Sequence, residues 1–194
     1  MSNVQPYSIL VGVGQLYRAA VGEPFPNVDA VPGANWTNMG NTDGGVTVTL
    51  EQTLAQHRVD QSTGPKKVTR SEENLVIETN LAQATLENLA SLLTEAVVDT
   101  PPGATTIGTR EINLYRGFTV QEFTLLFRGI SPYGPWPAQF QVPRGYFDGA
   151  VAIGHTKDAK QLFAARFVAL EDPDAASAAE RFGKLISQDA VATG

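Results

Sequence analysis

The stretch from Asp43 to Asn80, DGGVTVTLEQTLAQHRVDQSTGPKKVTRSEENLVIETN, decides the fold. Over its first half, valines and leucines alternate with threonines and a glutamate, and this period of two predicts a strand with one buried and one wet face. Gln61–Pro65 reads as a turn, and residues 66–79 continue as a second extended segment. The stretch therefore predicts a long hairpin, which follows a turn expected at residues 41–45.

One helix is expected directly after this hairpin, at about residues 81–96. Asn80 is a candidate N-cap, and the glutamine three residues later resembles the second half of a capping box. Leu86, Leu89 and Leu93 recur at helical spacing, so we expect them to pack the helix onto the core.

The rest of the chain is dominated by extended segments separated by loops rich in Pro and Gly. An acidic, Ala-rich tail with a weak helical stripe follows them. The sum predicts a single domain over residues 1–194, mainly β and antiparallel, in a sandwich or barrel-like arrangement with one flanking helix. The expected further strands cover residues 7–21, 110–118, 119–131, 138–154 and 160–171.

The composition narrows the classes of function. The chain has 194 residues, no cysteine, and 20 acids against 14 bases, for a net charge of −6. Zero cysteine excludes a disulfide framework and thiolate metal sites, and the negative charge argues against a nucleic-acid binder with a basic face. Charged residues make up 18% of the chain, below the usual share of about 25%. This deficit indicates that part of the exterior is hidden in contacts between subunits.

No constellation of catalytic or metal-binding residues is visible. His57 and His155 are the two histidines, and neither has the spacing of a zinc motif. No G-x-S-x-G elbow occurs, and adjacent Glu72 and Glu73 point to opposite faces of a strand. We therefore expect no enzyme activity, no metal and no cofactor. The N-terminal residues carry no export signal or membrane span, so the protein is expected to be made in the cytoplasm without a membrane partner.

Residues 44–93 resemble the major tail proteins of long-tailed bacteriophages, which are the tail tube subunits. The likeness lies in DGGV (43–46), Glu51, VDQ (59–61), the Gly-Pro turn and NLAQATLENL (80–89). The opening segment from Gly14 to Ala19 and the closing ALEDPDA (169–175) and LISQDA (185–190) also fit this family.

The resemblance implies a structural virion protein without catalytic activity. Six copies would close into a ring, and rings would stack into the tail tube, related to the inner tube of type VI secretion. The tube would conduct double-stranded DNA without binding it specifically. Expected partners are further copies of the chain, a tape-measure protein, and tail terminator and tip proteins.

The candidate functional residues lie in two arms, which would contact neighbouring subunits, and in a set of acids, which would face the lumen. Residues 41–66 are expected to reach the next ring, and residues 172–194 form a candidate C-terminal arm. Acids facing the lumen would repel DNA weakly and let it slide, whereas a basic lumen would hold phosphates. The candidate contacts between rings are Asp43, Gly44, Gly45, His57, Arg58, Asp60, Lys66 and Lys67. The candidate lumen acids are Glu51, Asp60, Glu72, Glu78 and Glu122.

Three other functions compete with the tail tube. The first is the inner tube of a tailocin or secretion-type machine, which neighbouring genes would separate from a phage tail. The second is a β-barrel that binds a small apolar ligand as a stable monomer, although the mid-chain helix and the hairpin do not suit it. The third is an enzyme on a β-sandwich, which the absence of a catalytic constellation disfavours.

Overall fold

The structure, a computed structural model, describes residues 14–93, 95–154, 157–158 and 160–191. Within this part of the chain the fold is mainly β and antiparallel with one α-helix, as predicted. The strands are β1 (Gln15–Ala20), β2 (Thr37–Asn38), β3 (Thr42–His57), β4 (Lys67–Leu81), β5 (Val97–Thr100), β6 (Thr109–Ile112), β7 (Phe123–Ile130), β8 (Pro137–Phe147), β9 (Phe163–Ala169) and β10 (Lys184–Ser187). The helices are α1 (Leu86–Leu93) and the 3₁₀ helix η2 (Ala178–Glu180).

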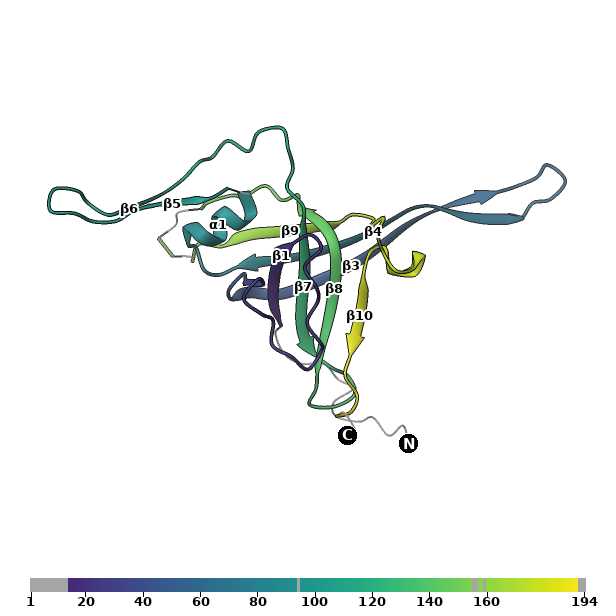
Figure 1. The fold of residues 1–194 in the computed structure, drawn as a ribbon. Helices are drawn as coiled ribbons and strands as arrows, with labels where there is room; N and C mark the ends of the chain where they lie inside the picture. Colours follow the sequence, from purple (N-terminus) through teal and green to yellow (C-terminus); the bar gives the residue numbers. More distant parts are fainter. Residues whose placement is uncertain (1–13, 94, 155–156, 159, 192–194) are drawn as a thin grey trace.

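Eight strands form one main sheet that bends at β8. Its order is β2-β1-β7-β8-β9-β4-β3, and β10 also pairs with β8. The first half of β8 pairs with β10, whereas its last residues, from Gly145, pair with β9. In Figure 1, β1, β7 and β8 run steeply, and β9, β4 and β3 run across them. The two halves of the sheet therefore cross at a steep angle, as in orthogonal packing.

The hydrophobic core lies between these two halves. Leu16 of β1, Leu125 of β7 and Val142 of β8 contribute from one side, and each is almost completely buried. Ile77 on β4 and Phe167 on β9 contribute from the other side and are equally buried. The segment expected to be extended at residues 66–79 is thus a strand whose inner end is buried from Leu75 to Ile77.

The helix is shorter than predicted because strand pairing takes its first expected residues. Asn80 and Leu81 belong to β4, where Leu81 is fully buried and pairs with Phe163 of β9. The predicted cap at Asn80 is therefore wrong. Thr85 caps α1 instead, since its Oγ1 accepts a hydrogen bond from the backbone N–H of Asn88 at 3.3 Å. The helix ends at Leu93 and not at residue 96.

Two other sequence expectations also differ from the structure. The strand expected at residues 110–118 stops at Ile112, and residues 113–122 are irregular before β7 begins. The weak helical stripe of the tail is a 3₁₀ turn followed by β10, which pairs with β8 from Lys184 to Ser187. That part of the candidate C-terminal arm is therefore a strand of the main sheet. Residues 7–13 of the first expected strand lie outside the described residues.

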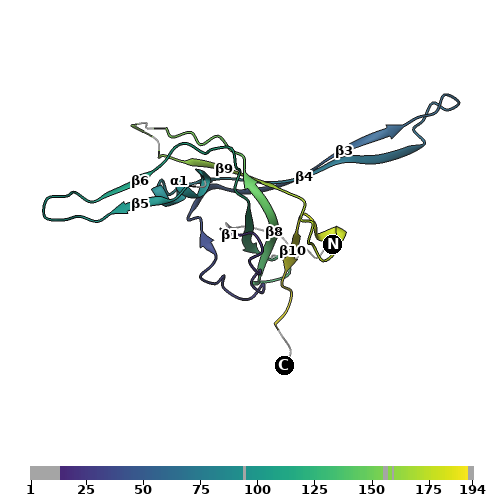
Figure 2. The ribbon, with the colours of Figure 1, turned by 45° about the horizontal axis from the view of Figure 1, so that its top comes forward.

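Two hairpins leave the body in opposite directions. The β3–β4 hairpin extends to one side, and the short β5–β6 hairpin extends to the other, as both views show (Figures 1 and 2). An ion pair of 2.5 Å between Arg110 on β6 and Glu87 on α1 links the base of the second hairpin to the helix. Surfaces far from each other on one chain are thus available for contacts with neighbours.

Candidate assembly surfaces

The β3–β4 hairpin continues well beyond the sheet that supports it. Strand β9 pairs with β4 at Val76–Leu81, and the described structure gives the rest of β4 no partner other than β3. We call residues 50–74 the outer arm. None of its residues is buried, and Figure 1 shows it standing free of the body. This segment is a two-stranded ribbon without a covering layer.

One face of the outer arm carries exposed apolar side chains among polar ones. Val48 packs against the core, and Leu50 and Leu54 follow it on the same face of β3, with Gln52 between them. Leu50 is 73% exposed and Leu54 is 51% exposed. Val68 of β4 lies on this face too, because its register partner is Gln56. The face that builds the core thus runs out into solvent uncovered, which is typical of a protein–protein contact.

The tip of the outer arm gathers five of the predicted inter-ring residues. His57 ends β3, and its Nε2 lies 2.8 Å from Oγ1 of Thr69. The turn closes through a backbone hydrogen bond of 2.9 Å from Lys66 to His57. Three bases and one acid make the tip positive, so it suits an acidic or polar neighbour. The charged residues of this tip are Arg58, Asp60, Lys66 and Lys67.

The other three predicted contacts lie far from the tip. Asp43, Gly44 and Gly45 are at the start of β3, which corrects their expected place in a turn next to the arm. The two glycines have φ values of 78° and 84° and form a bulge, where Asp43 and Val46 pair with consecutive residues of β4. Asp43 accepts a hydrogen bond of 2.6 Å from Lys160. The length of β3, about 45 Å at the usual rise, separates this group from the tip.

Three of the five predicted lumen acids share one face of the hairpin. Glu51 is on β3, and Glu72 and Glu78 are on β4 opposite Thr53 and Thr47. Partners in an antiparallel register point to the same side, and residues 47, 51 and 53 alternate in phase. This acidic face is therefore opposite the apolar face of Leu50 and Leu54.

The other two predicted lumen acids are elsewhere. Asp60 lies in the tip, and Glu122 lies just before β7. Glu122 binds Arg144 of β8 through two hydrogen bonds of 2.5 and 3.0 Å. These bonds hold the pKa of the Glu122 carboxyl below its usual range. Because its charge is matched within the chain, Glu122 contributes less repulsion than Glu51 and Glu72. Glu78 is also paired, with Arg166 at 3.1 Å.

The predicted helix residues lie at the core. Leu89 and Leu93 are buried in the main cluster, and Leu86 is partly buried against it. Their role in packing is thus confirmed, and α1 fixes the body from which the hairpins extend.

A second exposed apolar surface lies in the irregular segment between β6 and β7. Its large side chains are all more than half exposed, and Phe118 is fully exposed. We call residues 114–120 the apolar strip. The sequence contained a signal for it, because adjacent Leu114 and Tyr115 cannot both face one side of a strand. The large apolar residues of the strip are Leu114, Tyr115, Phe118 and Val120.

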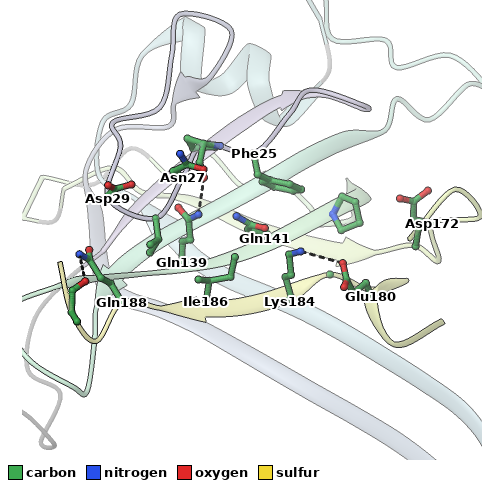
Figure 3. Close-up of a pocket in the computed structure, with 16 residues that line it drawn as sticks. Phe25, Asn27, Asp29, Gln139, Gln141, Asp172, Glu180, Lys184, Ile186 and Gln188 are labelled. Atoms are coloured by element: carbon green, nitrogen blue, oxygen red, sulfur yellow. Dashed lines mark hydrogen bonds and ion pairs between the residues drawn. The ribbon is translucent and has the colours of Figure 1, made fainter. Parts of the chain in front are cut away.

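A groove of about 640 Å³ lies between the loop at residues 25–29 and strands β8 and β10 (Figure 3). Gln139 lies at its floor, fully buried, and donates a hydrogen bond of 2.9 Å to the carbonyl of Pro26. Lys184 pairs with Glu180 at 3.1 Å on its rim. Polar and apolar residues line the groove in about equal measure, so its walls are not predominantly apolar as in a typical small-ligand pocket.

The described residues hold no group of three or more His, Asp or Glu arranged for a metal. In the same part of the chain, no helix has both the length and the apolar character to cross a bilayer. The sequence matches no model of a known family, and no curated protein matches it. The surfaces described above are therefore the main guide to what the chain does.

Proposed function

We propose that this chain is a self-assembling structural subunit that forms stacked rings, six-fold by the family resemblance, of a phage tail tube. The tube would serve as the conduit for double-stranded DNA in the virion. The tailocin or secretion-type inner tube uses the same assembly and stays the alternative. Tape-measure, terminator and tip proteins would be its further partners.

The observation that carries the proposal is the outer arm. A ribbon of two strands with an uncovered apolar face is a liability in a monomer, because it invites pairing and association. It becomes a contact surface once identical neighbours cover it. A head-to-tail contact repeated by rotation closes a ring, and a contact along the axis stacks the rings.

The charge distribution supports a conduit more than a binding site. Glu51, Glu72 and Glu78 share one face of the hairpin, and the chain as a whole carries a charge of −6. DNA carries one negative charge per roughly 1.7 Å of axis, so acids along a channel repel it without trapping it. A lumen lined by this face would favour transit.

The test is to shorten the outer arm without touching the core. Replacing residues 54–71 by Asn-Gly joins Thr53 to Glu72, which are already register partners, through a two-residue turn. We expect the wild-type chain to form rings and tubes in negative-stain electron microscopy, and the shortened chain to stay unassembled. An unchanged thermal midpoint of the shortened chain would show that its body still folds. Wild-type protein that stays monomeric at every concentration would contradict the proposal.

A further inference from the structure

The apolar strip exposes several large side chains, and Phe118 is the most exposed of them. Gly117 adopts a left-handed backbone with φ of 66°, a conformation that suits glycine, and this turn sets Phe118 into solvent. Exposed apolar side chains are costly in water, and the two aromatic ones, Tyr115 and Phe118, could each bury on the order of 150–250 Å² when covered. The strip therefore needs a partner.

A cleft of about 330 Å³ lies at the root of the outer arm, where η2 comes close to the hairpin. We call it the root cleft. The hairpin lines it with two apolar side chains, Leu50 and Leu75, and with the polar Arg70, Glu73 and Asn74. The C-terminal segment lines it with Phe182 together with Ala178, Ala179 and Gly183. A cavity of about 150 Å³ is enough to hold benzene, so the root cleft has room for a phenyl ring.

The strip and the cleft lie on opposite sides of the molecule. The strip follows β6 on the side of the β5–β6 hairpin, whereas η2 and the outer arm lie on the other side (Figures 1 and 2). One chain cannot bring them together, but two copies can. Such a contact is heterologous, and its repetition gives a ring or a helix.

The charges around the two surfaces also match. Arg116 stands within the strip, and in the described structure it has no ion-pair partner. Arg70 and Glu73 pair with each other in the wall of the root cleft. In the adjoining hollow Arg181 pairs with Glu171, and Glu72 adds a further carboxylate. The cleft side thus has one acid in excess, and the strip brings one base.

We propose that the apolar strip of one copy docks in the root cleft of the next, with Phe118 as its anchor and Arg116 facing the excess carboxylate. This inference rests on the proposed function, and it names the lateral contact of the assembly. The outer arm beyond Leu54 is then left for contacts along the tube axis.

The experiment compares three variants with the wild type by analytical ultracentrifugation and electron microscopy. Phe118→Asp disrupts the strip, Ala179→Trp fills the cleft, and Val31→Asp is the control, because Val31 is 82% exposed and lies outside both surfaces. We expect the first two variants to assemble at least about tenfold more weakly, and the control to match the wild type. Phe118→Leu should restore assembly, and all four thermal midpoints should stay close to that of the wild type.

Mixing the two defective variants gives the decisive result. Phe118→Asp keeps an intact cleft and Ala179→Trp keeps an intact strip. At a concentration at which each variant alone stays unassembled, the mixture should therefore form dimers that this contact cannot extend. Wild-type-like tubes from Phe118→Asp, or a mixture without dimers, would overturn the contact and leave the proposed function standing. If the wild type forms rings that require Phe118 but never forms tubes, the contact between strip and cleft is supported and the proposed tube function is refuted. A wild-type chain that never associates would refute both.

Discussion

The β3–β4 hairpin contains two regions with one sequence pattern and two different environments. In its inner half, Val46 and Val48 pack against the core and Ile77 is almost completely buried. In the outer arm the same alternation continues through Leu50 and Leu54, but the side chains are more than half exposed. The register runs through both halves, with shifts at residues 43–46 and 53–54.

The difference lies in what covers the strands. Strand β9, helix α1 and the steep half of the sheet cover the inner half. In the described chain, the segment of η2 and Phe182 comes near the root of the outer arm, and nothing covers the rest of it. A period-two pattern predicts that one face of a strand is buried, but it does not indicate whether the same chain or another molecule covers that face. We infer that the outer arm is matched to a surface on another copy.

The largest expected effect is in the inner half. Ile77→Ala removes most of a buried side chain and should lower the free energy of unfolding by about 2–5 kcal/mol. Denaturant unfolding of the unassembled chain measures it. Leu89→Ala on α1 should give a loss in the same range, and a loss well below 1 kcal/mol at either position would show that the core is not where we place it.

Leu54→Ala is the matched change in the outer arm. Because Leu54 is half exposed, the free energy of unfolding should stay within about 0.5 kcal/mol of the wild type. Assembly should weaken severalfold, since the variant loses apolar area at the proposed interface. Sedimentation at a series of concentrations separates the two effects. A Leu54→Ala chain that unfolds more easily but assembles normally would show that the outer arm contributes to folding and not to assembly.

The acidic face of the arm should affect transit more than assembly. In particles built with Glu51→Gln, tubes should form normally, and DNA release should slow and become more sensitive to salt. Glu111→Gln on β6 is the control, because it removes a carboxylate outside the β3–β4 hairpin. Release kinetics identical to those of the wild type would rule out the electrostatic role of this face.

The smallest effect concerns Glu122 in the body. Its pKa is lowered by the hydrogen bonds from Arg144, so the ionised form is favoured in the folded chain. The stabilisation is fully present above the unfolded pKa of about 4.3 and is lost as pH falls through the folded pKa. The difference in thermal midpoint between the wild type and Glu122→Gln should therefore be small at pH 7 and vanish in acid. A difference that grows in acid would contradict this account.

Much of the body could be predicted from the sequence because local and tertiary preferences agree there. The alternation at residues 46–54 and the extended segment at 66–79 are realised in β3 and β4, and Leu89 and Leu93 do pack α1 on the core. The helix start was wrong because the capping signal at Asn80 competes with strand pairing. Burial of Leu81 against Phe163 wins, since it satisfies backbone hydrogen bonds and the core together.

The candidate surfaces could be predicted in part. That the acids at 51, 72 and 78 share a face follows from the period of two of a strand. The ion pairs of Glu78 and Glu122 with arginines depend on contacts across the fold, which no local pattern indicates. Gly44 and Gly45 read as a turn because glycine favours positive φ, and the same property serves a bulge. The root cleft joins segments more than a hundred residues apart, which no local pattern indicates.

Side-chain hydrogen bonds between the two strands of the outer arm affect how fast new subunits could join. Arg70 donates to Gln52 at 2.9 Å, and Ser71 donates to the carbonyl of Thr53 at 3.2 Å. With the histidine–threonine contact near the tip, they hold the ribbon in shape while it is still alone. Because the arm is already ordered, it loses less conformational entropy when a new subunit binds to it. The rate at which subunits join is then limited by diffusion and orientation more than by folding of the arm.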